Sequence, residues 1–253
     1  MTVLTLRLAG PLQSWGAAAR FARRTTESAP TKSGVIGLLA AAKGIQRGDD
    51  ERLAKLAALR FGVRIDQPGT RLRDFQTAHH ADTGKAMPVS ERFYLADAVF
   101  VAAVEGDHDL LTDLHSALKA PLYPPFLGRR SCPPAQPMEM NLHLERDLQQ
   151  ALSTEPWQAS PWYARRQRNS PTVRLAVLHD ASADDDNADV LRDQPVSFAA
   201  EHRRHALRTV TRSEVEVPNP HARPNPHSTS RPRANPRVPH QHDPMAALAE
   251  VSD

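Results

Sequence analysis

Residues 3–16 read Val-Leu-Thr-Leu-Arg-Leu-Ala-Gly-Pro-Leu-Gln-Ser-Trp-Gly, and this stretch begins the fold. Leu4, Leu6 and Leu8 alternate with Thr5 and Arg7, which predicts a β-strand with one buried face. The glycine and proline that follow predict a turn. The chain therefore opens with a strand and a short loop that carries a glutamine and a tryptophan.

A helix is predicted soon after this loop. Residues 30–44 read Pro-Thr-Lys-Ser-Gly-Val-Ile-Gly-Leu-Leu-Ala-Ala-Ala-Lys-Gly, an apolar run from Gly34 to Lys43 that Gly44 closes as a C-terminal cap. Asp49 and Asp50 predict the start of a second helix. Residues 59–65 then alternate between apolar side chains and Arg or Gly, which predicts a second strand.

The next 80 or so residues predict a segment that extends away from the core and then a return to the core. Residues 67–92 are polar, basic and too long for a simple connection, which predicts an extended hairpin. Residues 95–104 are apolar on both faces and predict a buried central strand. A helix over 107–118, a proline-rich loop over 123–134 and an alternating strand over 138–144 follow.

The predicted order of strand, helix, strand, strand, helix, strand is that of an α+β, ferredoxin-like or RRM-like domain, here residues 1–145. Residues 146–217 predict a small β-rich C-terminal part, with strands over 173–178 and 206–217 around an acidic loop, 180–186. Residues 218–253 hold 8 of the 22 prolines and few apolar residues, which predicts a flexible tail, disordered on its own.

The composition favours a nucleic-acid partner and excludes some other classes. The 253 residues carry a formal net charge of +3, and arginine supplies most of the positive charge. Arginine suits phosphate and base contacts, although a high-GC genome also enriches it. A single cysteine excludes an intrachain disulfide and a cysteine-based zinc site. The absence of a signal peptide or an apolar run of membrane length predicts a soluble cytoplasmic protein.

Two motifs suit phosphate binding. Residues 31–34, Thr-Lys-Ser-Gly, stand at a predicted helix N-terminus, where free N–H groups and Lys32 favour an anion. The alternative is an ordinary helix cap. Residues 128–131, Gly-Arg-Arg-Ser, place paired arginines in a stiff loop that suits phosphate contacts, and the alternative is a solvated basic turn.

Aromatic residues are interleaved with basic ones in two places. Trp15 either stacks on a base or packs over the core, and the sequence leaves both open. The segment that extends away from the core mixes cationic and aromatic side chains, as single-stranded RNA binding requires. Its members are Arg71, Arg73, His79, His80, Lys85 and Arg92, with Phe75, Phe93 and Tyr94.

Catalytic patterns are sparse. Either His79 or His80 is a candidate general base for metal-free RNA cleavage, but neighbouring residues of a strand point to opposite faces. The sequence contains no metal-nuclease pattern. We therefore predict no metal, no cofactor and no catalytic residue.

Several segments closely resemble the Cas-five family of CRISPR-associated proteins, in its type I-E branch. They are residues 6–16, 30–39, 44–47, 73–77 and 123–133, in the family's order. The resemblance is specific over residues 4–134 and loose beyond about residue 145.

The resemblance implies an RRM-like (RAMP) fold with a protruding β-hairpin thumb over residues 67–95. It also implies a non-catalytic subunit of the antiviral CRISPR complex Cascade that binds and caps the 5′ handle of the CRISPR RNA. Its expected partners are that RNA, the Cascade backbone subunit and the large PAM-reading subunit. No membrane partner is expected.

Two alternatives stay open. A related protein of the type I-C branch cleaves precursor CRISPR RNA without metal, and this endoribonuclease reading would use His79, His80, Lys85 and Tyr94. A protein scaffold without RNA contact is the other.

The predicted RNA-binding surface joins separate parts of the chain. The handle-binding residues are expected near the first loop, the first helix and the arginine loop, and two more along the thumb. They are Gln13, Trp15, Lys32, Ser33, Tyr123, Arg129 and Arg130, with Arg73 and Arg92 on the thumb.

Overall fold

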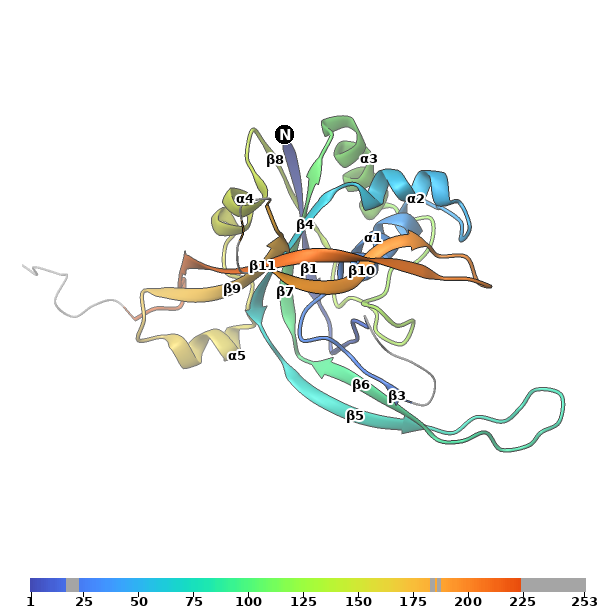
Figure 1. Ribbon diagram of the computed structural model, residues 1–253. Coiled ribbons are helices and arrows are strands. Elements are labelled where there is room, and N and C mark those ends of the chain that lie inside the picture. Colours follow the sequence, from blue (N-terminus) through green and yellow to red (C-terminus); the bar gives the residue numbers. More distant parts are fainter. Residues whose placement is uncertain (17–22, 183–184, 186–187, 224–253) are drawn as a thin grey trace, which may run out of the picture. The chain divides into compact units, whose positions relative to one another are not determined.

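The computed structural model describes residues 1–16, 23–182, 185 and 188–223, and a seven-stranded antiparallel sheet forms its centre (Figure 1). The strand order is β10-β11-β9-β4-β7-β1-β8. The strands are β1 (Thr2–Ala9), β4 (Arg60–Gln67), β7 (Val99–Gly106), β8 (Glu139–Leu144), β9 (Thr172–Asp180), β10 (Asp189–Ser197) and β11 (Arg204–Pro218). The protein is therefore α+β, as the sequence predicts.

Helices cover both faces of this sheet. Leu4, Leu6 and Leu8 of β1 share one apolar core with α1 (Lys32–Ala42), α2 (Asp50–Ala57) and α3 (His108–Lys119). Val3 and Val101 point to the other face, where they form a smaller core with α4 (Leu148–Thr154). The prediction that the first strand has only one buried face is wrong, because α4 closes the second face. No helix of the described residues is long and apolar enough to span a membrane.

Side-chain caps confirm the predicted helix starts. The side chains of Thr31, Asp49 and Asp107 accept hydrogen bonds from backbone N–H groups three residues later. These bonds satisfy donors that the first helical turn leaves free. At the other end of α1, Gly44 adopts φ +71°, a conformation that glycine tolerates best.

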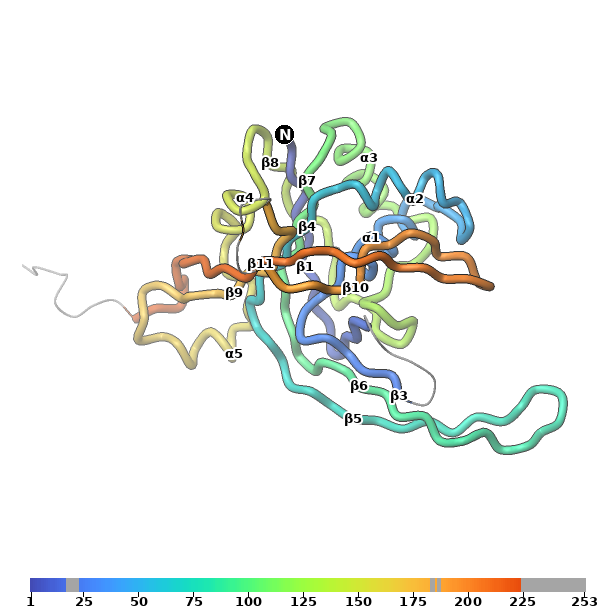
Figure 2. The backbone as a smooth tube through the Cα atoms, in the orientation of Figure 1, coloured from blue at the N-terminus to red at the C-terminus, as the bar shows by residue number. Residues whose placement is uncertain are grey.

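A second, smaller sheet extends from the first (Figures 1 and 2). β5 (Thr70–Gln76) and β6 (Ser90–Ala96) form a hairpin that pairs from Thr70–Ala96 to Gln76–Ser90. The short strands β2 (Leu12–Gln13) and β3 (Arg23–Arg24) pair with β6. The prediction of one continuous strand over 95–104 is wrong: Asp97 has φ +55° and separates β6 from β7, which belong to different sheets.

The C-terminal strands extend the main sheet. β9 pairs with β4 between His179–Val177 and Gly62–Arg64, and β11 and β10 follow outward. The expected boundary near residue 145 therefore does not separate two sheets. β10 was not predicted, because polar residues interrupt its apolar pattern. Of the predicted tail, residues 218–223 are described, and the remainder lies outside the described residues.

Candidate nucleic-acid interface

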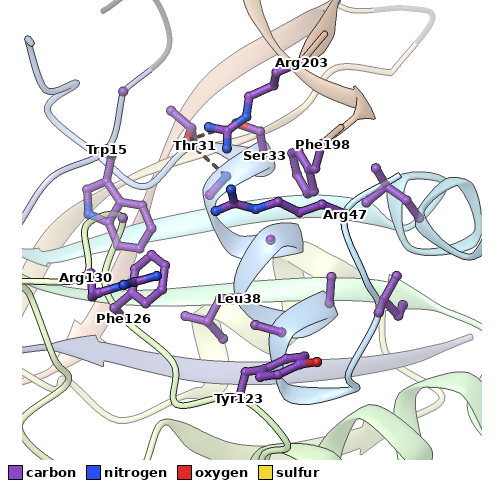
Figure 3. A pocket seen from close by; sticks show the side chains of 18 of the residues that line it. Trp15, Thr31, Ser33, Leu38, Arg47, Tyr123, Phe126, Arg130, Phe198 and Arg203 are labelled. Atoms are coloured by element: carbon purple, nitrogen blue, oxygen red, sulfur yellow. Dashed lines mark hydrogen bonds between the residues drawn. The ribbon is translucent and has the colours of Figure 1, made fainter. Parts of the chain in front are cut away.

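A cleft of about 910 Å³ runs along the outer side of α1 (Figure 3). Its walls come from four separate segments: residues 14–16, residues 45–48, the proline-rich loop 123–130 and the connection between β10 and β11. Because these segments are far apart in sequence, the cleft is a product of the tertiary fold.

The floor of the cleft consists of small residues of α1. Gly34 has no room for a side chain, since a Cβ there would lie 2.8 Å from Cε3 of Trp15. A Cβ on Gly37 would lie 3.6 Å from Cε2 of Phe198, in ordinary contact. The two glycines allow aromatic rings to approach the helix closely.

Three exposed arginines line the cleft. Figure 3 shows Arg130 beside Phe126 at one end, and Arg47 and Arg203 near Phe198 at the other. Among the described residues, none of the three forms an ion pair with a carboxylate. Loss of hydration, and then the neighbouring charge of Arg47, lower the pKa of Arg203. Positive charges that line one cleft and form no ion pairs create a positive potential that attracts anions.

Aromatic rings stand beside these charges. Tyr123 is 46 % exposed, and Phe126 and Phe198 are partly exposed. The Arg203 guanidinium carbon lies 5.9 Å from the centre of the Phe198 ring. Rings that stack on bases, next to guanidiniums that bind phosphates, are the combination that single-stranded nucleic acids require.

The predicted arginine pair is divided between two roles. Gly128 adopts φ +84°, and a Cβ there would lie 1.7 Å from the carbonyl oxygen of Ser14. Only glycine fits this turn. Arg130 lines the cleft, whereas Arg129 lies over the ring of Tyr94.

Gln13 and Trp15 lie inside the protein. Both side chains are fully buried. Gln13 Nε2 donates to the carbonyls of Leu8 and Ala98 at 3.1 and 2.8 Å, and Gln13 Oε1 accepts from Trp15 Nε1 at 3.0 Å. The packed alternative for Trp15 therefore describes this structure: Trp15 forms part of the cleft wall, and Gln13 supports it from behind.

The N-terminus of α1 holds an anion from the protein itself. The backbone N–H of Lys32 donates to Asp193 Oδ2 at 2.8 Å, and Lys32 Nζ lies 3.2 Å from Asp180 Oδ2. Arg208 contacts both carboxylates and completes the network. The helix end that was predicted to bind phosphate therefore holds Asp193 in this structure, and Asp180 compensates the charge of Lys32. Ser33 is nearly buried, but it lines the cleft.

The thumb arginines lie on the hairpin and do not line the cleft. Arg73 is exposed and forms an ion pair with Glu91, which also lies 3.8 Å from Arg23 Nε. Arg92 is partly buried, and its backbone pairs with Asp74. The charge of Arg73 is thus partly compensated, unlike that of the cleft arginines.

The candidate nuclease residues do not come together. His79, His80 and Lys85 are exposed near the hairpin tip, where the His80 N–H donates to the Lys85 carbonyl. Tyr94 is buried and pairs with Leu72, towards the base of the hairpin. Within the described ranges, no three His, Cys, Asp or Glu side chains are grouped so as to hold a metal ion.

Two arginines and two phenylalanines that line the cleft were not among the predicted site residues: Arg47, Arg203, Phe126 and Phe198. Arg47 follows the glycine cap of α1, and Phe126 precedes the arginine loop. Residues 198–205 read Phe-Ala-Ala-Glu-His-Arg-Arg-His, a mixture of basic and aromatic residues that was an available signal.

The fold and the cleft define an α+β protein with a surface suited to nucleic acid, and comparison with known proteins identifies its class. Residues 3–211 match the family described as "CRISPR-associated protein (Cas_Cas5)". This chain belongs to the Cas5 family, which confirms the resemblance seen in the sequence.

Individual relatives agree with this assignment. The chain is 37 % identical over 167 residues to "CRISPR system Cascade subunit CasD" of Escherichia coli (strain K12), covering 59 % of this chain and 75 % of CasD. A structure titled "CRISPR RNA-guided surveillance complex" contains a chain with a TM-score of 0.71 and 32 % identity, covering 89 % of this chain and 95 % of that one. A structure titled "Crystal structure of Cas protein" matches with a TM-score of 0.65 and 36 % identity, and the match covers 88 % of this chain and 99 % of that one.

Proposed function

We propose that this protein is a non-catalytic subunit of a Cascade-type CRISPR surveillance complex and that the cleft along α1 binds the 5′ handle of the guide RNA. The observation that carries the proposal is the set of three exposed arginines without ion-pair partners in the described structure, placed beside Tyr123, Phe126 and Phe198. The names of the similar proteins support the same assignment, since they refer to Cascade and to an RNA-guided complex.

The fold supports the finer description. We infer a ferredoxin-like or RRM-like domain from the order β8-β1-β7-β4, with helices following β1 and β7 in the chain. The β5–β6 hairpin corresponds to the proposed thumb, and Leu72, Phe75 and Met87 are exposed apolar side chains on it. We assign this hairpin to the backbone subunit and to the path of the RNA, with Arg73 and Arg92 along it. The large PAM-reading subunit is the other proposed protein partner, and the cytoplasm is the proposed location.

Within the cleft the roles divide by chemistry. Arg47, Arg130 and Arg203 bind phosphates, which holds the RNA without reading its sequence. Tyr123 and the two phenylalanines stack on bases. Gln13, Trp15, Lys32 and Arg129 hold the walls in place, and Ser33 offers a hydroxyl at the floor.

The test is guide-RNA binding by the triple variant R47A/R130A/R203A. We expect weaker binding and a log–log salt slope reduced by about 2, because each lost phosphate contact removes roughly 0.7 from the slope. The matched control K55A/K119A/R192A removes the same charge from exposed positions outside the cleft. Equal losses of slope in both variants would overturn the assignment of the cleft.

A further inference from the structure

A second basic and aromatic surface lies outside the cleft, on α5 (Pro161–Ala164) and the 3₁₀ helix η1 (Arg165–Gln167). We call Trp162, Arg165, Arg166 and Arg168 the α5 patch. Trp162 is 47 % exposed, and the three arginines are exposed. None of the three arginines forms an ion pair within the part of the chain that the structure describes.

A ladder of aromatic rings holds Trp162 in place. Its ring meets Tyr163 edge to face, with 5.8 Å between the ring centres, and Tyr163 meets Trp157 in the same way at 6.3 Å. Trp157 is buried, and its Nε1 donates to the Asp66 carbonyl at 3.0 Å. The exposed indole is therefore anchored through two rings to the core, and a ligand does not have to order it on binding.

Arg166 extends this ladder outward. Its guanidinium carbon lies 5.0 Å from the centre of the Trp162 ring. A flat guanidinium over an indole leaves its N–H groups available for phosphate oxygens. One base-sized flat surface and three positive charges thus lie within seven residues, Trp162 to Arg168.

The α5 patch is separate from the cleft. No residue between 131 and 197 lines the cleft, and Figure 1 shows α5 beside β9 and apart from α1. The patch is therefore a second surface and not part of the cleft lining.

We propose that the α5 patch binds a second single strand of nucleic acid, distinct from the guide handle. The arginines supply phosphate contacts, and Trp162 with Arg166 supplies a stacking surface. A single strand fits better than a duplex, because paired bases already stack on each other and do not offer their faces. An acidic protein segment would pair with the arginines but would leave the anchored indole without a specific use.

The experiment measures anisotropy of a labelled single strand of mixed sequence, with the purified full chain saturated by unlabelled guide RNA. We expect R165A/R166A/R168A to lower the affinity and to reduce the log–log salt slope by about 2. W162A should weaken binding about tenfold, whereas W162Y should retain it, because tyrosine still stacks on a base. Parallel RNA and DNA strands show which chemistry the patch prefers.

Two comparisons separate this site from the proposed function. The variant K55A/K119A/R192A controls for the loss of three positive charges. The cleft variant R47A/R130A/R203A should still bind the labelled strand, because the α5 patch is intact in it whether or not the cleft assignment is correct. Strand binding by R165A/R166A/R168A equal to that of the charge control would overturn the proposal. If R165A/R166A/R168A bound the strand like the wild type but no longer bound a partner subunit, the proposal would also be overturned, and the patch would be a protein interface.

Discussion

The guanidinium carbon of Arg129 lies 4.6 Å from the centre of the Tyr94 ring, and Nη2 of Arg129 donates to the carbonyl of Arg24 at 2.9 Å. Arg130, the next residue, lines the cleft instead. One arginine therefore ties the proline-rich loop to the base of the hairpin, while its neighbour is available to a ligand.

This division predicts opposite effects of two single substitutions. Arg130→Ala should reduce the log–log salt slope of guide-RNA binding by roughly 0.7, and it should change the free energy of unfolding by less than about 0.5 kcal/mol. Arg129→Ala should lower the free energy of unfolding by about 1–2 kcal/mol, because a cation–π contact and a hydrogen bond are lost. Denaturant melts and salt titrations on the same preparations measure both. The division is refuted if Arg129→Ala reduces the slope as much as Arg130→Ala does.

The two glycines of α1 should respond differently to a methyl group. Gly34→Ala should destabilise the protein by about 1–3 kcal/mol, because the new Cβ would lie 2.8 Å from the buried Trp15 ring. Gly37→Ala should be neutral or stabilising by up to about 1 kcal/mol, since its Cβ meets Phe198 at an ordinary 3.6 Å and alanine favours a helix. Thermal melts decide this, and a reversed order of stabilities would contradict the packing described.

The carboxylate at the N-terminus of α1 should be essential for stability. Asp193→Asn should lower the free energy of unfolding by about 3–5 kcal/mol, because Asp193 is fully buried and its loss leaves two cations, Lys32 and Arg208, with the single carboxylate of Asp180. Asp50→Asn serves as the control, because its ion pair with Arg204 is largely exposed and should cost less than about 1 kcal/mol. Similar costs for the two variants in urea unfolding would argue against a buried network.

Glu155 should contribute a pH-dependent part of the stability. Burial alone would raise its pKa, but hydrogen bonds from Thr5, Asn141 and His143 outweigh burial and lower the pKa below the ordinary 4.5. A carboxyl group with a lowered pKa in the folded state stabilises the protein above its ordinary pKa, and this contribution disappears as the pH falls through the lowered value.

The matching variant is Glu155→Gln, which keeps the shape and removes the titration. We expect the wild type to lose more stability than Glu155→Gln between pH 5 and pH 3, as estimated from the ordinary carboxyl range. Urea unfolding at several pH values measures the difference. Parallel pH profiles would show that Glu155 titrates alike in both states.

The purified protein should not cleave CRISPR repeat RNA, in EDTA or with divalent metal. The candidate residues His79 and Tyr94 lie towards opposite ends of the hairpin, so they cannot act on one phosphodiester. Denaturing gels of labelled repeat RNA test this, with His79→Ala and His80→Ala as controls. Specific products that disappear in either variant would establish the endoribonuclease alternative.

The sequence by itself determined the local elements and the family. The alternation of Leu4, Leu6 and Leu8 predicted β1, and capping residues such as Thr31 and Asp107 predicted the helix starts, because strand periodicity and helix caps depend on neighbours within a few residues. The motif spacing over residues 4–134 identified the Cas5 family, which the comparison with known proteins confirms.

Only the tertiary structure decided which positive charges are available to a ligand. Lys32 meets Asp180, 148 residues away, and Arg47 meets Arg203, 156 residues away, so one charge is neutralised and the other two reinforce each other. Both outcomes depend on β9, β10 and β11 joining the main sheet next to α1. Electrostatic free energy depends on the distance between charges in space and not on their separation along the chain. The residues next to Lys32 or Arg47 in the sequence therefore do not show which distant charges each of them meets.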